Sequence, residues 1–586
     1  MITKVSNFFL FISYLLFSVI KCEKPNIVII LADDLGYNDV SFHGSSEIPT
    51  PNLDALCYNG VILNRFYTTP LCTPSRSSLM TGKYSTKLGM NHYVIPSDEP
   101  WGLPLNEKII PEYFKEAGYK TALIGKWHLG FFKKSYTPLM RGFDYHYGYL
   151  GPYIGYYDHS LIMLDRNYSR GFDMRNNFEV ENVRGKYATD VFTDEAVNLI
   201  KRHNTSDPLF LLLSHLAPHA GNEDKPLEAS EEVINKFAYI KNEQRRTLAA
   251  MINIMDDGIG RVVEALNEKG IMNNTIIMFL SDNGGPTFGI HSTEASNSPL
   301  RGQKGSVWEG GTRVPACIYS PLIKNKNRVT NEFMYITDIL PTMAAAANIS
   351  ITNNIDGINQ FETISNSKIT ERKDILYNIE SVFGFSAIMS NGFKLVNGSE
   401  NMKYSGWFGS SGDYAATSLE EYFQNIINSI TYKNLPMIDI DIVKKMREES
   451  KTVCDNSIST TKCNPIQAPC LFDIINDPCE KDNLAEIYPD KVKMLIEKLN
   501  IEIQLMVPTI RVKSDPLCDP KLHNWTWTWW RQDDDQSANV NKEDDDFSSR
   551  TTLIFVICFI FIIIQFFIFF IKCKKNSENF TIFRLQ

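Results

Sequence analysis

The 586-residue chain has no excess of basic side chains. Its 59 lysines and arginines are outnumbered by 68 aspartates and glutamates, which gives a formal net charge of −9. This balance argues against a nucleic-acid partner. The chain also lacks internal repeats.

Length and composition are otherwise ordinary. A chain of 586 residues is too long for one hydrophobic core, so two or more domains are expected. Hydrophobic residues make up 43% and charged residues 22%, as in globular proteins.

Long hydrophobic runs are rare, and only two are found. The first lies within residues 1–22, where Lys4 precedes an apolar stretch, and it predicts a secretory signal peptide. An uncleaved anchor is the alternative.

The second run, residues 553–571, is interrupted only by Gln565 and predicts a transmembrane helix. Lysines follow it in the predicted cytoplasmic tail, residues 572–586. An acidic stalk, residues 532–552, precedes it. We therefore expect a single-pass type I membrane protein of the cell surface or lysosome, whose body is lumenal or extracellular. N-glycosylation sequons support a lumenal or extracellular location of the body. They are at Asn167, Asn204, Asn273, Asn348, Asn397 and Asn524.

Seven of the 11 cysteines are candidates for disulfides. The other four are Cys22 in the signal, Cys72, Cys558 in the membrane run and Cys573 in the tail. Five of the seven lie late in the chain, where disulfides are expected in a secreted protein. The pairing is not readable, and one cysteine is left over. The candidates are Cys57, Cys317, Cys454, Cys463, Cys470, Cys479 and Cys518.

Acidic pairs follow two apolar, β-branched runs. Residues 26–31 precede Asp33 and Asp34, and residues 275–280 precede Asp282 and Asn283. The runs predict buried parallel strands, at whose carboxyl ends open α/β sheets place ligands. A solvated turn is the alternative for Asp33 and Asp34. Four hard oxygen ligands without a neighbouring Cys/His pair favour calcium or magnesium over zinc.

Other segments have clear periodicity or turn signals. Helices are predicted over residues 107–117, 243–268 and 489–506, strands over 121–125 and 210–213, and a hairpin over 385–396 with Asn391-Gly392 at its turn.

Cys72 lies in the run Cys72-Thr73-Pro74-Ser75-Arg76. Taken alone, it could be an inert, half-buried thiol. A helix is predicted to start just after Pro74, and its amino terminus would suit a bound anion.

This run resembles the signature of the sulfatase family. Two further blocks resemble the same family, Gly125-Lys126-Trp127-His128-Leu129-Gly130 and the glycine-rich residues 299–315, where the B, I and J group of arylsulfatases is most similar. The resemblance extends over residues 24–530. It implies an alkaline-phosphatase-like α/β sandwich around a large mixed sheet, residues 23–373, followed by a smaller α+β domain, residues 374–531.

The resemblance also implies the chemistry. Cys72 would be converted to formylglycine by the formylglycine-generating enzyme, and one calcium ion would be bound. Implied roles follow for each residue. The metal ligands are Asp33, Asp34, Asp282, Asn283 and Cys72, the catalytic residues are Cys72, Arg76 and His128, and the sulfate-binding residues are Lys126, His219 and Lys304. His215 competes with His219 for its role.

Hydrolysis of a sulfate monoester is therefore expected, from a sulfated glycan or an aryl sulfate. Sulfated N-acetylgalactosamine of glycosaminoglycans is the leading substrate. Residues 91–103 lack the cysteines that the B-type enzyme carries there, so a different pocket rim is expected. Two alternatives stay open: a membrane-tethered, non-catalytic binder of sulfated glycans, and a phosphodiesterase or phosphatase of the same superfold.

Overall fold

The computed structural model describes residues 24–163, 170–289, 291–399, 402–411, 418–454, 462–510 and 512–533. The predicted signal peptide, transmembrane run and tail lie outside the described residues, as does nearly all of the predicted stalk. The described residues up to Arg531 belong to one compact unit.

A central strand, β1 (Asn26–Ala32), organises the structure. All seven of its residues are buried, and alternate side chains enter two separate hydrophobic cores on the two faces of the sheet. This explains why the run is continuously apolar rather than alternating. Four further strands continue the parallel part of the sheet: β10 (Leu209–Ser214), β11 (Thr275–Ser281), β4 (Lys120–Lys126) and β5 (Tyr145–Tyr149).

Short strands extend this sheet at both edges. The order is β13-β2-β12-β11-β1-β10-β4-β5-β8-β9, so ten strands pair in one mixed sheet and the prediction of a large mixed sheet is confirmed. The antiparallel pairings are β11 with β12, β12 with β2, β5 with β8, and β8 with β9. The added strands are β2 (Val61–Leu63), β12 (Ala316–Tyr319), β13 (Arg328–Thr330), β8 (Arg175–Asn176) and β9 (Glu179–Val180).

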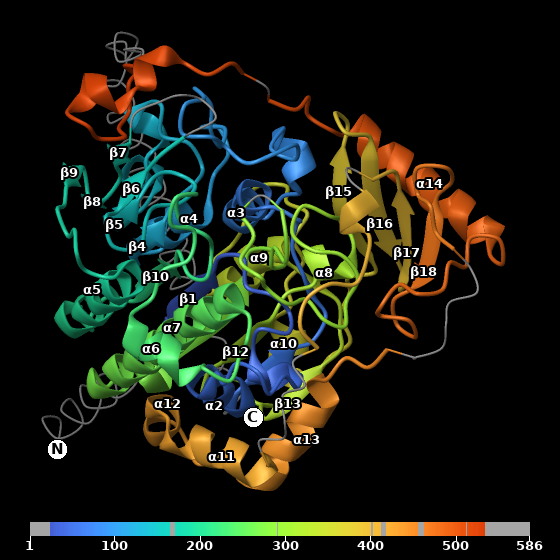
Figure 1. Cartoon of the computed structure of the whole chain (residues 1–586), viewed down its shortest axis with the longest axis horizontal. Helices are drawn as coiled ribbons and strands as arrows, with labels where there is room; N and C mark the ends of the chain where they lie inside the picture. The colour runs from blue at the N-terminus through green and yellow to red at the C-terminus, as the bar shows by residue number, and fades with distance from the viewer. Residues whose placement is uncertain are drawn as a thin grey trace, which may run out of the picture. The chain divides into compact units, whose positions relative to one another are not determined.

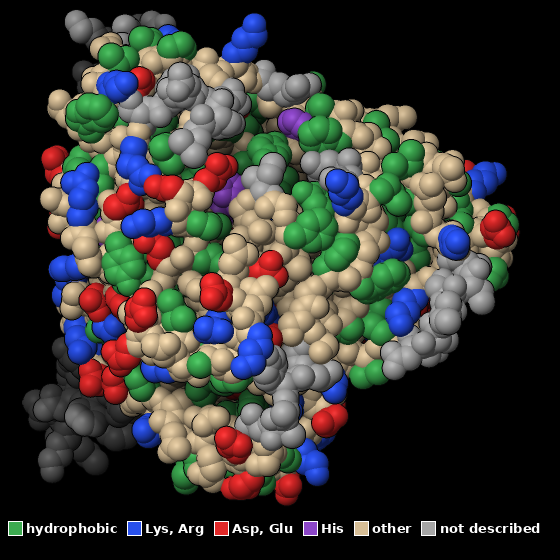
Figure 2. All heavy atoms as spheres, in the orientation of Figure 1, with side chains coloured by type: hydrophobic (Ala, Val, Ile, Leu, Met, Phe, Trp, Pro, Cys, Tyr) green, Lys and Arg blue, Asp and Glu red, His purple; other side chains and the backbone are tan. Residues whose placement is uncertain are grey.

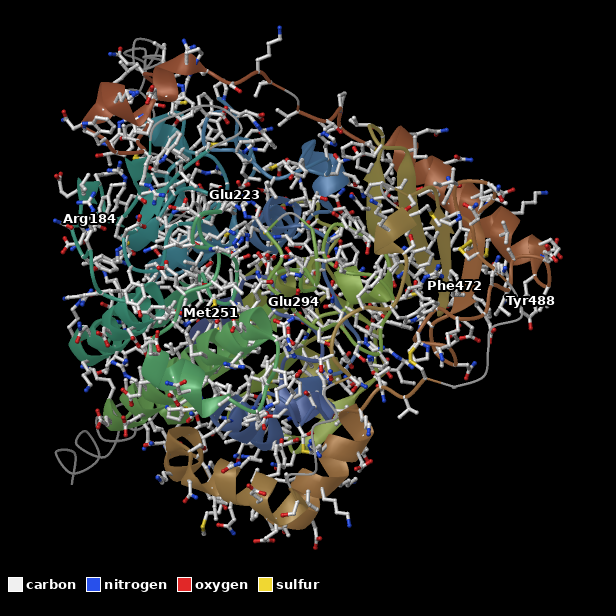
Figure 3. All side chains as sticks on the ribbon, viewed as in Figure 1. Arg184, Glu223, Met251, Glu294, Phe472 and Tyr488 are labelled. Atoms are coloured by element: carbon white, nitrogen blue, oxygen red, sulfur yellow. A yellow bond between two sulfur atoms is a disulfide. The ribbon has the colours of Figure 1, made fainter. Side chains whose placement is uncertain are left out.

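Helices cover both faces of the sheet (Figure 1). The long amphipathic helix α7 (Glu243–Glu268) has the predicted bounds, and its buried stripe includes Met251, which is labelled in Figure 3. One core contains side chains of α7, α5 (Ala188–Arg202) and α2 (Pro51–Asn59). The other contains side chains of α3 (Cys72–Thr81), α4 (Ile110–Glu116) and α9 (Ile339–Ala346).

A small antiparallel sheet follows in the C-terminal part, as predicted. The Asn391-Gly392 turn joins its second and third strands, and both turn residues have positive φ, 48° and 83°. Phe472 of the last strand is labelled in Figure 3. The elements are β15 (Asp374–Glu380), β16 (Phe385–Ser390), β17 (Phe393–Asn397), β18 (Cys470–Asp473) and α14 (Pro489–Gln504).

Three helices between β17 and β18 pack on the large sheet's own helices. They are α11 (Leu419–Asn428), α12 (Ile430–Asn434) and α13 (Ile440–Ser450). The Tyr422 hydroxyl donates to Asp54 Oδ2 at 2.6 Å, and Thr431 N donates to Asn52 Oδ1 at 3.0 Å. This segment therefore adds to the layer formed by α2 and α7.

The prediction of a single-pass membrane protein is corrected. In the part of the chain that the structure describes, no helix is both long enough and apolar enough to cross a bilayer. The run that carried the prediction, residues 553–571, lies outside that part.

Disulfides join six of the seven candidate cysteines. Cys454 pairs with Cys479 and Cys463 with Cys470, within the late cluster. The third pair, Cys57–Cys317, spans 260 residues of sequence and ties α2 to β12. Cys518 belongs to none of these three pairs.

Two glycines with positive φ offer a matched test of how tightly β4 and β10 are packed. A Cβ at Gly125 (φ 100°) would lie 1.9 Å from the Ser214 carbonyl oxygen, whereas Gly118 (φ 87°) has no atom within 4 Å. Gly118→Ala should therefore lower the free energy of unfolding by only about 1 kcal/mol, the cost of holding alanine at a positive φ. Gly125→Ala should cost roughly 3 kcal/mol or more, because the strands must also move apart. Urea unfolding of both variants measures this, and equal losses would show that the close approach is absent.

Candidate active site

The predicted site residues meet at the carboxyl edge of the parallel strands. Asp33 and Asp34 follow β1, and Asp282 and Asn283 follow β11. The two strand ends are locked together, since Asp282 N donates to Ala32 O at 3.1 Å and Asp34 N donates to Asp282 Oδ1 at 3.3 Å. All four side chains are buried. The structure thus brings the ends of β1 and β11 together at one edge of the sheet.

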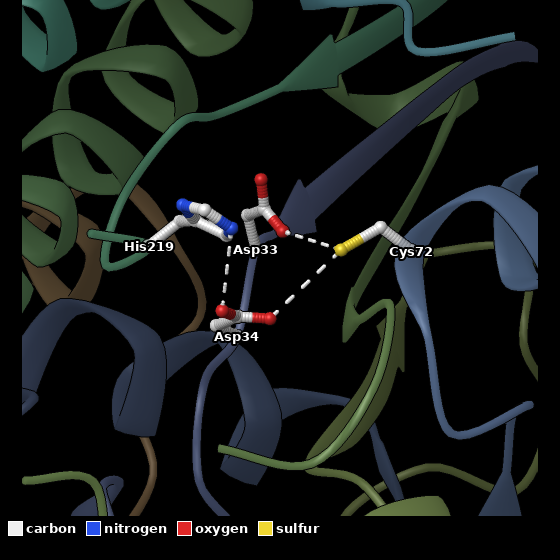
Figure 4. Close-up of side chains that lie close together, drawn as sticks. All are labelled: Asp33, Asp34, Cys72 and His219. Carbon is white, nitrogen blue, oxygen red and sulfur yellow. Dashed lines mark hydrogen bonds and ion pairs between the residues drawn. The ribbon is translucent and has the colours of Figure 1, made fainter. Parts of the chain in front are cut away.

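Cys72 is the first residue of α3, three residues earlier than the predicted helix start just after Pro74. Its Sγ lies 3.5 Å from Asp33 Oδ1 and 4.0 Å from Asp34 Oδ1 (Figure 4). Burial raises the pKa of the thiol, and the opposing effect of Lys126 and Lys304 is smaller. The unmodified side chain is therefore a neutral thiol at neutral pH.

Three cations face the three carboxylates. Lys126 Nζ lies 2.5 Å from Asp33 Oδ2, and Lys304 Nζ lies 2.6 Å from Asp34 Oδ2. Arg76 Nε and Nη2 lie 3.0 and 2.8 Å from Asp282 Oδ2. Each charge is inside the protein rather than on its surface, where Figure 2 shows acidic and basic side chains intermixed.

Burial acts on the pKa values of this network. It raises the pKa of Asp34 despite the opposing charge of Lys304, and it raises the pKa of Asp282. For Lys304, burial is the largest single effect and opposes the charged form, but Asp34, Cys72 and Asp33 together outweigh it and the net pKa is raised. Lys304 is therefore a fixed positive charge.

His128 follows β4 in the left-handed region, at φ 57°. Its Nε2 lies 3.1 Å from the Ile95 carbonyl oxygen, so Nε2 carries the proton. Its Nδ1 is buried and accepts no hydrogen bond from any described residue. Burial, reinforced by Lys126 and Arg76, lowers the pKa of His128, so the ring is neutral and Nδ1 is a vacant base.

His219, not His215, reaches the site. His219 Nε2 lies 3.5 Å from Asp34 Oδ2, and Nδ1 donates to the Ala220 carbonyl oxygen at 2.5 Å. Burial and then Lys304 and Lys126 lower its pKa, so Nε2 is unprotonated. The His215 ring is buried, and neither of its nitrogens has a hydrogen-bond partner in the described chain.

A metal ion fits the donors at this edge. Ligand atoms of Asp33, Asp34, Cys72 and His219 all lie within 4.8 Å of one another. Asn283 Oδ1 is buried without a hydrogen-bond partner among the described residues, so an amide oxygen is available. Carboxylate and amide oxygens suit a hard cation. Asp282, expected as a ligand, directs Oδ2 to Arg76 and accepts Asp34 N at Oδ1.

Two residues that hold the site were not singled out from the sequence. Ser214, the last residue of β10, accepts a 2.7 Å hydrogen bond from Arg76 Nη1. Thr73 Oγ1 accepts from Ile95 N at 3.1 Å and donates to the His128 carbonyl oxygen at 3.3 Å. Thr73 thus ties the helix start to the strand end that carries His128. The only sequence signal for either residue is its place beside a predicted site residue.

Comparisons with known proteins agree with this geometry. The sulfatase family model matches residues 25–349. Arylsulfatase J of Mus musculus is 36% identical over 516 residues, which cover 87% of this chain and 80% of that protein. N-acetylgalactosamine-6-sulfatase of Homo sapiens is 30% identical over 369 residues, 61% of this chain and 68% of that protein. The crystal structure of Ps i-CgsB has a TM-score of 0.66 at 28% identity, over 86% of this chain and 97% of that one. It has also been solved in complex with k-i-k-neocarrahexaose.

The donor set predicts that the purified protein binds a single divalent cation. Asp34→Asn should weaken that binding roughly tenfold or more, since it removes one of the two carboxylates that face Cys72. The matched control is Asp54→Asn, an equally buried carboxyl whose partners are the hydroxyls of Ser41, Thr50 and Tyr422. Elemental analysis after dialysis measures both variants. Unchanged metal content in Asp34→Asn would overturn the ligand assignment.

Proposed function

This chain belongs to the sulfatase family and is a sulfuric ester hydrolase, and we propose that it removes sulfate from glycosaminoglycan sugars through a formylglycine at position 72 and a calcium ion. The observation that carries the proposal is the position of Cys72, at the start of α3 and within 4.0 Å of both Asp33 and Asp34. A nucleophile there faces the donors for a cation and three positive side chains.

The state of the thiol supports its conversion. Because burial raises its pKa, Cys72 carries little thiolate, which is the nucleophilic form of cysteine. A thiol that attacked a sulfate ester would also form a stable adduct. Formylglycine supplies a hydrated aldehyde, one hydroxyl of which can attack sulfur while the other lets the sulfate leave.

Asp33, Asp34 and Asn283 would hold calcium, with Asp282 beside them. The orphaned Asn283 Oδ1 and the two carboxylates are hard oxygen donors. Calcium at this place would neutralise sulfate oxygens and orient the residue at position 72. His219 and the sulfur of Cys72 complete the cluster, so elemental analysis must separate calcium from zinc.

Positive side chains would bind the rest of the sulfate. Lys126 and Lys304 are preorganised, since each is held by a carboxylate and needs little rearrangement to face an anion. Arg76 reaches from α3 to Asp282 and Ser214, and its position steadies the helix start that carries Cys72.

Two proton transfers are needed, one when sulfate is released from position 72 and one to the leaving oxygen of the substrate. Nδ1 of His128 is the vacant base, and it would accept the proton from the second hydroxyl at position 72 when sulfate is released. On the leaving-group side, the choice lies between Lys304 and His219. Lys304 is already protonated, whereas His219 must first gain a proton at Nε2. Because the raised pKa of Lys304 disfavours loss of its proton, we keep both His219 and Lys304 as candidate proton donors to the leaving oxygen.

Sulfated N-acetylgalactosamine is the proposed substrate. One relative at 30% identity is named N-acetylgalactosamine-6-sulfatase, and a structural neighbour at 28% identity was solved with a neocarrahexaose. Both names indicate carbohydrate substrates. The alternative of a non-catalytic glycan binder is disfavoured, because each residue that the chemistry requires is present in the sequence. The alternative of a two-zinc phosphodiesterase is disfavoured, because a cysteine stands where a threonine or serine nucleophile is needed.

Conversion of Cys72 is directly testable. In protein made by eukaryotic secretory expression, mass spectrometry of the tryptic peptide 66–76 should show formylglycine at position 72. A Cys72→Ala variant, expressed in parallel, should show no such product and should lose sulfatase activity with the fold intact. If the active wild-type enzyme carries only an unmodified thiol, the proposed nucleophile is wrong.

The role of His128 predicts unusual kinetics. His128→Ala should allow a first turnover, seen as a burst of released alcohol, and then slow steady turnover by about a hundredfold or more. The matched control is His215→Ala, an equally buried histidine at the end of a neighbouring strand, which should retain wild-type turnover without a burst. Stopped-flow measurement with an aryl sulfate distinguishes the two. Steady, near wild-type turnover by His128→Ala would remove the role given to Nδ1.

A further inference from the structure

Two aromatic side chains that the mechanism does not use stand beside His219. The Tyr153 ring is stacked on the His219 ring, with centroids 5.8 Å apart and an interplanar angle of 18°. The His291 ring lies 4.8 Å from Tyr153 and 5.8 Å from His219. Both Tyr153 and His291 are half-buried, whereas Lys126, His128 and His219 of the sulfate site are buried.

These rings come from the same sheet edge as the catalytic groups. Tyr153 lies in the loop after β5, and His291 lies in the loop after β11, nine residues past Asp282. The Tyr153 hydroxyl donates to the Ile162 carbonyl oxygen at 3.3 Å, which fixes the ring's orientation. The loops therefore place a rigid aromatic wall at the rim of the site.

The position of the nucleophile determines which part of a substrate meets this wall. Cys72 and His219 lie on opposite sides of the Asp33–Asp34 pair, and they approach different oxygens of Asp34 (Figure 4). In a displacement at sulfur, the attacking and leaving oxygens are in line, as they are in phosphoryl transfer. A group attacking from position 72 therefore expels the leaving oxygen toward His219.

We propose that Tyr153 and His291 form the subsite for the sugar ring that carries the sulfate, and that they select a pyranose sulfate. This inference rests on the proposed sulfatase function. The C–H face of a pyranose packs well on an aromatic ring, and ligand sites commonly combine aromatic walls with a few polar groups. Tyr153 supplies a flat surface, and the His291 imidazole supplies a ring with polar edges. The sulfate itself is bound elsewhere, by Lys126, Lys304 and the cation.

The experiment separates sugar binding from sulfate binding. For Tyr153→Ala and His291→Ala, the KM for sulfated N-acetylgalactosamine should rise about fivefold or more in each. Values of kcat should stay within about twofold. The inhibition constant of inorganic sulfate, which fills only the sulfate site, should be unchanged. The matched control, Tyr153→Phe, keeps the ring and removes the hydroxyl that donates to Ile162 O, so its KM should stay near the wild-type value.

Two results would overturn the inference. One is an unchanged KM in both alanine variants. The other is a fall in kcat or a weaker sulfate inhibition without a rise in KM, which would mean that the rings only support His219. Should the wild-type enzyme release sulfate from no ester, the proposed function fails instead. Saturation-transfer NMR with unsulfated N-acetylgalactosamine then still tests the wall, since the sugar should bind wild type and not Tyr153→Ala.

Discussion

Three buried ion pairs hold the site together: Asp33 with Lys126, Asp34 with Lys304, and Asp282 with Arg76. None of these six side chains is more than 12% exposed. An isolated buried charge is costly, and removing one partner of a buried pair leaves the other uncompensated. The charges must therefore be assembled together, and this happens only where β1, β4 and β11 end at one edge and α3 begins. The same balance prepares the site for sulfate, because cations already held at fixed positions need no reorganisation to face an anion.

The small C-terminal sheet takes part in this arrangement through the glycine-rich loop that carries Lys304. Lys394 of β17 lies 2.9 Å from both Glu309 and Glu480, and all three side chains are fully buried. Burial raises the pKa of Glu480 to about 7, against the charge of Lys394. Arg301, at the start of the loop, stacks on Trp308 at 3.7 Å and donates to Glu480 O at 3.1 Å. The loop is thus clamped on both sides of Lys304, which explains how a residue outside the sheet holds a fixed place in the site.

The sequence predicted the parts whose signals are local. The bounds of α7 follow from its amphipathic period, and the buried strands follow from uninterrupted apolar runs. Elements that form only by pairing with a segment distant in the sequence were not predicted. Strand β2 has three residues and exists because β12 and β13 flank it, and the Cys57–Cys317 bond depends on that pairing. The start of α3 was placed too late, because proline is tolerated in a first helical turn and Pro74 is its third residue. For the site, the residue types came from motifs and resemblance, whereas the pairing of each lysine with a carboxylate required the structure.

The two sides of the site are built differently, and this bears on substrate choice. The sulfate side consists of strand ends and α3, where a substitution disturbs buried charges and the packing of the central sheet. The proposed leaving-group side consists of loops after β5 and β11, whose half-buried rings of Tyr153 and His291 lie beside His219. Loops of this kind can change while the scaffold stays intact. Under the proposed function, the charged groups of the strand ends bind the sulfate, whereas the choice of sugar falls to loop residues such as Tyr153 and His291, which can change without disturbing those buried charges.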